Sequence, residues 1–478
     1  MSQQYRPTIG IEIHVQLATK SKMFCTCAND SREAAPNTNI CPVCLALPGT
    51  LPVINKRAVE LAIKLGVGIN AKVTEFTKFD RKNYFYPDSP KGYQISQFDK
   101  PIVHDGKVEI LVGGEFKTIG VERAHLEEDA GKLIHPDGAI HSLVDLNRAG
   151  TPLVEIVSRP DMHSPEEAKR YLQEIYNIAM TLGITNGDLE HGNFKFDLNI
   201  SVSKDPAKLG TRTELKNLNS FRNAERALTY EIERQVGVLE AGGTIDQETR
   251  GWNDAKSITF SQRGKEEAHD YRYFPEPDLP PLVIKDAMVG SIKKEVGVMP
   301  IDVRRELHSI GLSTDEQDIL ISQPTVAKLF FEAKKALADK KLEKKAVNWL
   351  VGDYQAILAG SSSKDSKLSA DNLVALIKLV DEGKISSKIA KDIFADVVDG
   401  QSPAEVIKSK GLSQISDTTE LEAIIKRLVE DNPKAAADYQ NGNTKALGFF
   451  VGQVMKETKG QANPSVVNTI LLQYLQGK

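Results

Sequence analysis

The segment "IGIEIHVQL", residues 9–17, brings a carboxylate and an imidazole to one face of a predicted strand. Apolar and polar residues alternate along it, and successive side chains of a strand point to opposite faces. Glu12 and His14 therefore share the polar face, while Ile11 and Ile13 share the apolar one. Carboxylate and imidazole groups can bind metal ions or transfer protons. The spacing predicts a strand with reactive groups on one side.

Further acidic residues occur in segments whose patterns predict strands. They are Glu127, Glu128 and Asp129 in "HLEEDAGK", Glu155 in "TPLVEIVS", Asp197 in "FKFDLNISV" and Glu214 in "GTRTELKNLNS". Carboxylates that converge repel one another unless a cation neutralises them. Mg2+ is the natural candidate, because it accepts carboxylates and keeps positions for water and substrate phosphates. The alternative is ordinary polar residues on surface strands.

A basic stretch accompanies these acids. "KFDRKNYFYPD" contains Arg81, Lys82 and Asn83 just before three aromatic residues. Cations and an amide near carboxylates could bind the phosphates of a nucleotide. The alternative is a salt-bridged turn whose aromatic residues pack into the core. The sequence has neither a Gly-x-x-x-x-Gly-Lys-Ser/Thr loop nor a dinucleotide-binding fingerprint. If ATP binds, we expect it on an open sheet, held through metal and cations.

The four cysteines form two close pairs, Cys25 with Cys27 and Cys41 with Cys44. In a protein of the cytoplasm, such pairs indicate a structural zinc site with four thiolate ligands more than disulfides. A closed site of this kind leaves no position for substrate, so it would stabilise the fold without taking part in the reaction. The alternative is buried, reduced thiols without a ligand role.

The elements that must position these groups point to an α+β fold. Strand-like alternation in residues 194–202 precedes a predicted helix that starts after Ser220 and stops at Gly242 and Gly243. Another helix follows Ser164, with Glu167 completing a capping-box pattern. Because strands are adjacent or joined by short loops, we expect a mixed or largely antiparallel sheet.

Composition changes near residue 294, where Lys-, Ala-, Leu- and Glu-rich helical periodicity begins. We predict a catalytic domain over residues 1–293, a helical domain over 294–405 and a small helical tail over 406–478. The hydrophobic share of 40% and charged share of 26% are those of an ordinary globular protein. No secretory signal or membrane-spanning run is present, which predicts a cytoplasmic location and no membrane partner. The net charge of −4 leaves nucleic-acid binding to local basic surfaces.

Several long motifs resemble one family closely. They are "GIEIHVQL", "FDRKNYFYPDSPKGYQISQ", "HLEEDAGK", "VDLNRAGTPLVEIVS", "ELKNLNSF" and "DYRYFPEPDLP". Together they resemble the B subunits of bacterial glutamyl/aspartyl-tRNA amidotransferases, essentially end to end. The resemblance implies conversion of Glu-tRNA(Gln), and in many bacteria Asp-tRNA(Asn), to the amidated form. It also implies two partners in a heterotrimer, an amidase subunit that releases ammonia from glutamine and a small third subunit that bridges the two.

The resemblance implies further features of fold and site. The N-terminal cradle would be similar to glutamine synthetase and guanido kinases, and the tail would be YqeY-like and contact tRNA. The four cysteines match the zinc-bearing members of the family. Family members usually read Glu-x-Gly-Ser-Leu/Phe-Arg-x-Asp where this chain has "EHGNFKFD". Lys195 stands for the arginine there, Asn193 for the serine and Phe196 for a small residue. With lysine in place of arginine, a phosphate or carboxylate contact would lose its bidentate geometry.

ATP-dependent amidation requires activation, because a carboxylate oxygen is a poor leaving group. Phosphorylation of the aminoacyl side chain would give an acyl phosphate that ammonia attacks, with Mg2+ and cations neutralising charge. We predict Glu12, His14, Glu127, Glu128 and Glu155 as Mg2+ ligands or near-ligands, and Arg81, Lys82, Asn83 and Lys195 as nucleotide-binding residues. Lys82, Glu12, Glu128, Asp197 and Glu214 are the predicted catalytic residues.

Two rival classes remain from the residues alone. An ATP:guanido phosphotransferase or an amide ligase for a small metabolite would use a similar sheet, but neither explains the helical appendages. A non-catalytic RNA-binding adaptor explains the tail but not the acidic sheet. For the tail, Lys408, Lys410, Lys426, Arg427, Lys445 and Lys456 are candidate phosphate contacts, or else parts of a solvated helical face.

Overall fold

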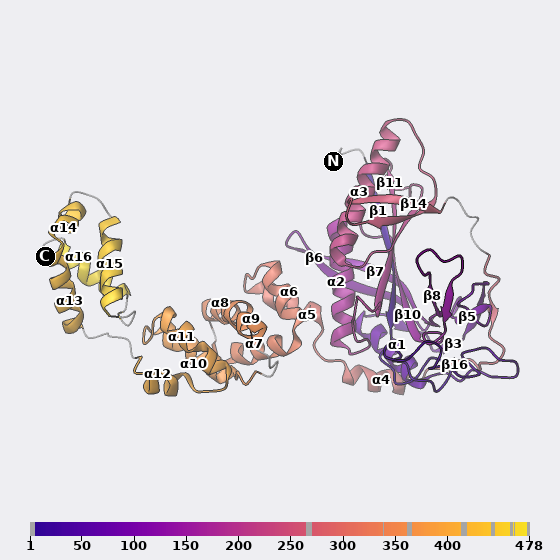
Figure 1. Cartoon of the computed structure of the whole chain (residues 1–478), viewed down its shortest axis with the longest axis horizontal. Coiled ribbons are helices and arrows are strands. Elements are labelled where there is room, and N and C mark those ends of the chain that lie inside the picture. Colours follow the sequence, from indigo (N-terminus) through magenta and orange to yellow (C-terminus); the bar gives the residue numbers. More distant parts are fainter. Residues whose placement is uncertain are drawn as a thin grey trace. The chain divides into compact units, whose positions relative to one another are not determined.

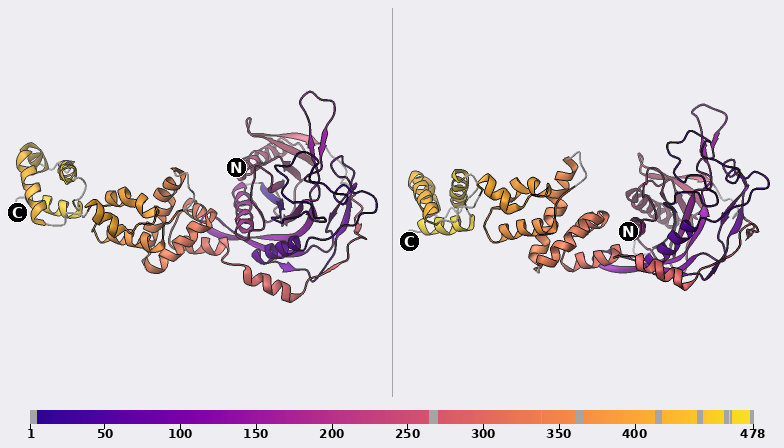
Figure 2. Two further views of the ribbon diagram at one scale, coloured as in Figure 1. Left: turned by 60° about the horizontal axis from the view of Figure 1, so that its bottom comes forward. Right: turned by 90° about the horizontal axis from the view of Figure 1, so that it is seen from below.

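The computed structural model describes residues 5–263, 270–337, 339–360, 366–412, 418–440, 445–458, 462 and 464–475. The chain divides into two compact units, Met1–Val303 and Arg304–Lys478 (Figure 1). Among the described residues all strands belong to the first unit, and the second consists of helices (Figure 2). The three-domain division after residues 293 and 405 stays a prediction.

A nine-stranded sheet forms the framework of the first unit. Its order is β14 (Ile258–Arg263), β13 (Glu248–Asn253), β12 (Thr213–Lys216), β11 (Phe194–Ser203), β1 (Arg6–Gln16), β10 (Pro152–Ser158), β7 (Glu115–Glu128), β6 (Val103–Val112) and β2 (Lys72–Val73). Neighbouring strands are antiparallel except the parallel pair β12 and β13. The predicted α+β class with a mixed sheet is confirmed.

The apolar face of β1 is the centre of the core. Ile9, Ile11, Ile13 and Val15 are at most 1% exposed. Burying such side chains stabilises the fold by roughly 1.5–3 kcal/mol each. Helices α1 (Lys56–Gly68), α2 (Pro165–Thr181) and α3 (Phe221–Glu240) pack on the strands, and α4 (Asp286–Glu295) packs on α1. The polar side chains of β1 are left on the other face of the sheet.

Local capping explains where the two longest helices begin. Ser164 accepts the backbone N–H of Glu167 at the start of α2, and Ser220 accepts that of Asn223 at the start of α3. The Glu167 side chain accepts the backbone N–H of His163 rather than that of Ser164, so the predicted capping box is not completed. Lys117 also donates to this carboxylate. The predicted helix starts are confirmed.

Smaller sheets complete the first unit. β15 (Phe274–Pro275), β4 (Asp80–Asn83) and β5 (Tyr93–Ser96) form one, and β16 (Leu282–Val283) pairs with β3 (Phe76–Thr77). β8 (Lys132–Ile134) pairs with β9 (Leu143–Asp145). Because β5 packs on β7, the three-stranded sheet lies next to the strand that carries Glu127.

The secondary-structure elements described in the second unit are all helices, and the first of them, α5, begins just before the boundary between the units. Its helices are α5 (Pro300–Ser309), α6 (Thr314–Ser322), α7 (Pro324–Leu337), α8 (Lys340–Asn348), the π-helix η1 (Trp349–Asp353), α9 (Tyr354–Gly360), α10 (Ala370–Asp381), α11 (Ser387–Val398), α12 (Pro403–Lys410), α13 (Thr418–Asp431), α14 (Pro433–Gln440), α15 (Lys445–Glu457) and α16 (Pro464–Leu475). Helices α13, α15 and α16 share a hydrophobic core of their own, which includes Leu421, Phe450 and Leu471. Nowhere in the described chain is a helix both long and apolar enough to cross a membrane.

Candidate functional site

A cavity of about 650 Å³ opens on the polar face of the large sheet. Its walls come from seven strands and two loops of the first unit. The lining residues are Glu12, His14, Lys82, Gln97, Phe98, Pro101, His104, Glu122, Arg123, His125, Glu155, Asp197, Glu214, Lys216, Tyr271 and Tyr273. Acids, imidazoles, cations and aromatic rings from distant parts of the chain therefore share one chamber.

A row of charged side chains crosses three neighbouring strands at the base of this cavity. Strand register pairs His14 of β1 with Glu155 of β10, and Glu155 with His125 of β7. The Nε2 atom of His14 lies 3.3 Å from a Glu155 oxygen and 3.5 Å from a Glu127 oxygen. The Nε2 atom of His125 lies 3.5 Å from each of the same two carboxylates. We call His14, Glu127 and Glu155, with His125, the imidazole–carboxylate cluster.

Burial and charge act in opposite directions on this cluster. Burial alone would lower the pKa of His14, but its hydrogen bond to Glu155 and the charge of Glu127 raise it to about 9. Burial would raise the pKa of Glu155, and the bond to His14 outweighs it, so that pKa lies below its usual range. The pKa of Glu127 is lowered by His125 against the same desolvation. Both carboxylates are therefore anionic near neutral pH.

A second group of acids lies beside the cluster. Glu12 pairs in register with Asp197 and accepts the Asn199 amide at 3.1 Å. The Lys216 ammonium bridges Asp197 and Glu214, at 3.2 Å from each. Burial, followed by the charge of Glu155, raises the pKa of Glu12. Negative charge on this face is thus incompletely balanced within the described residues.

The residues of the cluster are suitable ligands for a divalent cation. One ligand atom from each of His14, Glu127 and Glu155 can be chosen so that all lie within 4.8 Å of one another. Glu12 and Asp197 lie next to the cluster and add negative charge that a cation would neutralise. Two carboxylates are compatible with Mg2+, whereas the imidazole also suits ions such as Mn2+. An ion bound at Nε2 of His14 would displace the proton that the raised pKa of this imidazole favours.

Lys82 is the member of the basic stretch that faces the cavity. Its ammonium lies 4.8 Å from the centre of the Tyr271 ring. Burial would lower the pKa of Lys82, but the charges of Glu127 and Glu155 raise it overall. The side chain is therefore a half-buried cation close to the imidazole–carboxylate cluster.

The structure does not bring Arg81, Asn83 or Glu128 into this cavity. Arg81 forms a two-point salt bridge with Glu276, at 2.8 and 2.7 Å, because its side chain lies on the opposite face of β4 from Lys82. Asn83 donates to the carbonyls of residues 271 and 272, at 3.1 and 2.8 Å. Glu128 binds Lys91 at 2.7 Å and accepts the backbone N–H of Ile95 at 3.1 Å. It lines a separate cavity of about 240 Å³ beside Cys25 and Cys44.

The residues that depart from the usual family motif have different surroundings. Lys195 pairs in register with His14 and is exposed on the polar face of β11. Phe196 points to the other face, where it is 4% exposed and stacks on Phe221 with ring centres 6.0 Å apart. Asn193 donates to Gln16 at 2.6 Å. The Phe196 difference is therefore a matter of core packing. Lys195 shares the polar face with His14 but does not line the cavity.

Sequence reasoning missed several residues of the cavity. His125 lies in the motif "HLEEDAGK" and, by alternation, must share a face with Glu127. Arg123, two residues earlier, lies on the same face for the same reason. No local sequence pattern predicts that Phe98, Tyr271 and Tyr273 line the cavity, because their positions depend on the paths of two loops.

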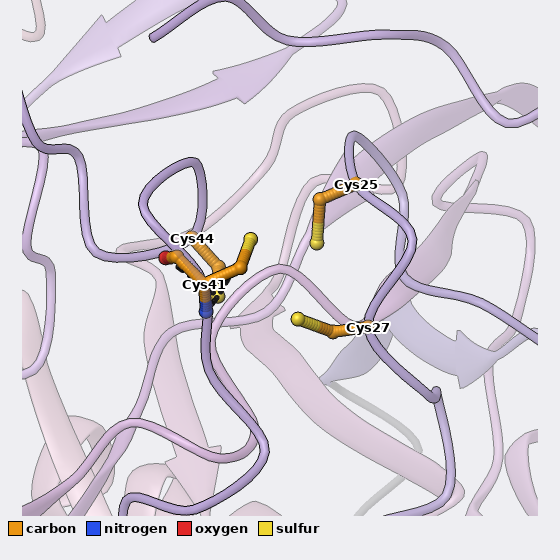
Figure 3. Close-up of side chains that lie close together, drawn as sticks. All are labelled: Cys25, Cys27, Cys41 and Cys44. Atoms are coloured by element: carbon orange, nitrogen blue, oxygen red, sulfur yellow. Dashed lines mark hydrogen bonds between the residues drawn. The ribbon is translucent and has the colours of Figure 1, made fainter.

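The four cysteine sulfurs converge from two loops (Figure 3). All four lie within 4.8 Å of one another, and the Sγ atoms of Cys41 and Cys44 are 3.8 Å apart. Tetrahedral zinc with bonds of about 2.3 Å requires sulfur separations of about 3.8 Å. The ammonium of Lys22, which is 0% exposed, lies 3.7 Å from the Cys44 sulfur. A buried ammonium needs an anion nearby, so Lys22 supports thiolates at this site.

Zinc binding by the four cysteines can be tested independently of the cavity. We expect the purified protein to contain about one zinc per chain, and Cys44→Ser to lose most of it, since a closed site needs all its ligands. Metal analysis and thermal unfolding measure the result, with unfolding at lower temperature for the variant. A metal-free wild-type protein whose stability chelators do not change would contradict the assignment.

Comparison with known proteins gives a consistent picture. Residues 7–290 match the family described as the GatB/GatE catalytic domain, and residues 328–475 match the GatB domain of the YqeY type. The chain is 48% identical over 477 residues to the B subunit of the aspartyl/glutamyl-tRNA(Asn/Gln) amidotransferase of Thermoanaerobacter pseudethanolicus, covering 99% of both chains. It is 46% identical over 484 residues to the corresponding protein of Thermotoga maritima, covering 99% of this chain and 100% of that one. Both alignments include the residues that line the cavity and the helices of the second unit.

Proposed function

The chain belongs to the family of B subunits of tRNA-dependent amidotransferases, and from this premise we propose how its cavity takes part in the reaction. It is part of a glutamine-dependent ligase that converts misacylated Glu-tRNA(Gln) or Asp-tRNA(Asn) to the amidated form. The proposal is that ATP phosphorylates the side-chain carboxylate of the bound aminoacyl-tRNA in the cavity. Ammonia then displaces phosphate from the acyl phosphate, forming the C–N bond.

The proposal includes partners that one chain cannot supply. The cavity lacks an evident nucleophile for releasing ammonia from glutamine among its lining residues. We therefore propose that a partner amidase is the ammonia source and that a small third subunit bridges the two proteins in a heterotrimer. Such a complex would work in the cytoplasm, where aminoacyl-tRNAs are made. We also propose that the large sheet with its polar open face is the cradle fold of glutamine synthetase and guanido kinases.

The imidazole–carboxylate cluster is the proposed divalent-ion site. His14, Glu127 and Glu155 would hold Mg2+, with Glu12 adjacent, and the ion would supply neutralisation of phosphate charge. Glu128 is not one of the proposed ligands, because its carboxylate already binds Lys91 and the backbone N–H of Ile95.

The residues of the chain itself account for the remaining steps. Lys82 brings a partly buried positive charge to the phosphoryl group that is transferred. Lys195 is the proposed second phosphate contact, because it is exposed on the strand position opposite His14, although it does not line the cavity. Asp197 and Glu214, bridged by Lys216, are placed to attract ammonium and accept its proton before attack.

One observation carries this function: distant strands bring His14, Glu155 and Lys82 together in one cavity. Glu127 does not line the cavity, but its carboxylate lies 3.5 Å from His14. The test uses the chain assembled with the amidase and the small bridging protein. We expect ATP hydrolysis to be stimulated by Glu-tRNA(Gln) or Asp-tRNA(Asn), and not by free glutamate or aspartate. Stimulation by a free amino acid would favour a small-metabolite ligase, and a lack of ATP hydrolysis would favour an RNA-binding adaptor.

The tail is the proposed tRNA contact of the second unit. Lys426, Arg427 and Lys456 are exposed on α13 and α15, and Arg427 pairs with Glu457. The Lys445 side chain lies outside the described residues, and Lys408 and Lys410 belong to α12.

Truncation after residue 412 tests this contact without cutting α12. The tail has its own hydrophobic core, so its removal should leave the other helices intact. We expect the KM for tRNA to rise by about tenfold or more, with a weaker dependence on salt, because phosphate contacts are lost. Glutamine hydrolysis should change by less than twofold. An unchanged KM for tRNA would exclude the tail from binding.

A further inference from the structure

An aromatic pair lies at the edge of the charged cavity and has no role in the mechanism above. The rings of Phe98 and Tyr273 are stacked, with centres 4.3 Å apart and planes 9° from parallel. Both residues line the cavity together with His14, Glu155 and Lys82. We call Phe98 and Tyr273 the aromatic pair.

One ring of this pair is open to a ligand. Phe98 is 58% exposed, whereas its neighbour Gln97 is buried. An exposed aromatic face beside a polar cavity gives flat, uncharged rings an apolar surface that the surrounding acids and lysines do not. The pair therefore differs in chemistry from the charged residues of the cavity wall, and a third aromatic residue, Tyr271, lies beside Tyr273.

The pair is held in place from both sides. The backbone N–H of Phe98 donates to the buried Asp80 at 3.0 Å. The Gln97 side chain accepts the backbone N–H of Leu126 at 3.0 Å, which fixes the segment to β7. Tyr273 directly precedes β15, which pairs with β4. A ring that is fixed before binding loses little conformational freedom when a ligand stacks on it.

We propose that the exposed face of Phe98, backed by Tyr273, stacks on an adenine base during the reaction. This inference rests on the proposed function, whose two substrates, ATP and the 3′-terminal adenosine of aminoacyl-tRNA, both present adenine. A base at Phe98 leaves the ribose and the groups beyond it directed along the cavity, which Lys82, His14 and Glu155 also line. Arg123 and His104 line the same cavity, where they pair with Glu122 and Asp105.

The test is made on the assembled enzyme, with Phe98→Leu as the main variant. Leucine keeps an apolar side chain but removes the aromatic face, and Phe98→Trp enlarges that face. Base stacking on an aromatic ring changes affinity by about five- to 150-fold, so we expect the KM for one adenine-containing substrate to rise about tenfold in Phe98→Leu. The Phe98→Trp variant should keep that KM within about threefold of the wild type, and kcat should change by less than threefold in both.

The two substrates are titrated separately to identify the source of the base. If only the KM for ATP rises, the base that stacks on the pair is that of ATP. If only the KM for Glu-tRNA(Gln) rises, the base is that of the terminal adenosine of the tRNA. Phe85→Leu is the matched control, because Phe85 is 93% exposed in the neighbouring loop but does not line the cavity. Tyr273→Leu is a second variant and should raise the same KM.

Any other pattern overturns the inference. Unchanged KM values in Phe98→Leu, equal rises for both substrates, or a rise that Phe98→Trp shares would each exclude adenine stacking at this position. Wild-type enzyme that amidates tRNA while Phe98→Leu behaves normally removes only this inference. Wild-type enzyme without tRNA-dependent amidation removes the proposed function itself.

Discussion

Replacing Glu155 by glutamine is expected to reduce ATP-dependent amidation by about 1000-fold or more. The carboxylate of Glu155 lies 3.3 Å from His14 and 3.5 Å from His125, at the centre of the imidazole–carboxylate cluster. Glutamine keeps the size of the side chain but removes the charge that a divalent ion requires. A loss of about 4 kcal/mol of transition-state stabilisation corresponds to that factor. His14→Ala should have a similar effect, since it removes another proposed ligand.

The measurement compares two activities of the same assembled complex. Amidation of Glu-tRNA(Gln) should be lost in both variants, while glutamine hydrolysis by the amidase and assembly of the heterotrimer should remain. Glu115→Gln is the matched control, because Glu115 is exposed on the same sheet and lies outside the cavity lining. Full amidation by Glu155→Gln would remove the proposed ion site.

The sequence alone could predict which side chains share a face of a strand, because apolar and polar residues alternate along it. It correctly assigned Ile11 and Ile13 to the core, and it places Glu12 and His14 on the opposite face. The same rule applies to "HLEEDAGK" and pairs Glu127 with His125 rather than with Glu128. We predicted Glu127 and Glu128 as joint ligands because acids were clustered in sequence, and neighbours in a strand cannot share a face.

The convergence of the cluster could not be derived from local pattern. It depends on the register between β1, β10 and β7, whose residues are more than a hundred positions apart for His14 and Glu155. The loops that place Tyr271 and Tyr273 over the sheet have no periodicity to interpret. The α+β class and the helix starts were accessible because they depend on neighbouring residues such as Ser164 and Ser220.

The neighbouring residues Lys82 and Arg81 should respond to substitution in opposite ways. Lys82→Met keeps an unbranched side chain against Tyr271 and removes the positive charge, so we expect amidation to fall by about 100- to 1000-fold with little change in stability. Arg81→Met leaves the Glu276 carboxylate, whose side chain is 0% exposed, without its cation. Breaking a buried pair of this kind costs about 3–5 kcal/mol. The main effect expected for Arg81→Met is therefore a lower stability of the fold.

Thermal unfolding and amidation on the same preparations separate the two roles. For Lys82→Met we expect an almost unchanged unfolding temperature, normal glutamine hydrolysis and little amidation. For Arg81→Met we expect a clearly lower unfolding temperature, with most amidation retained below it. Because the two side chains leave the same strand in opposite directions, a reversal of these results would mean that the phosphate-binding face of β4 is the one occupied by Arg81 and Asn83. The phosphate contact would then have to be sought near Glu276, on the far side of the three-stranded sheet.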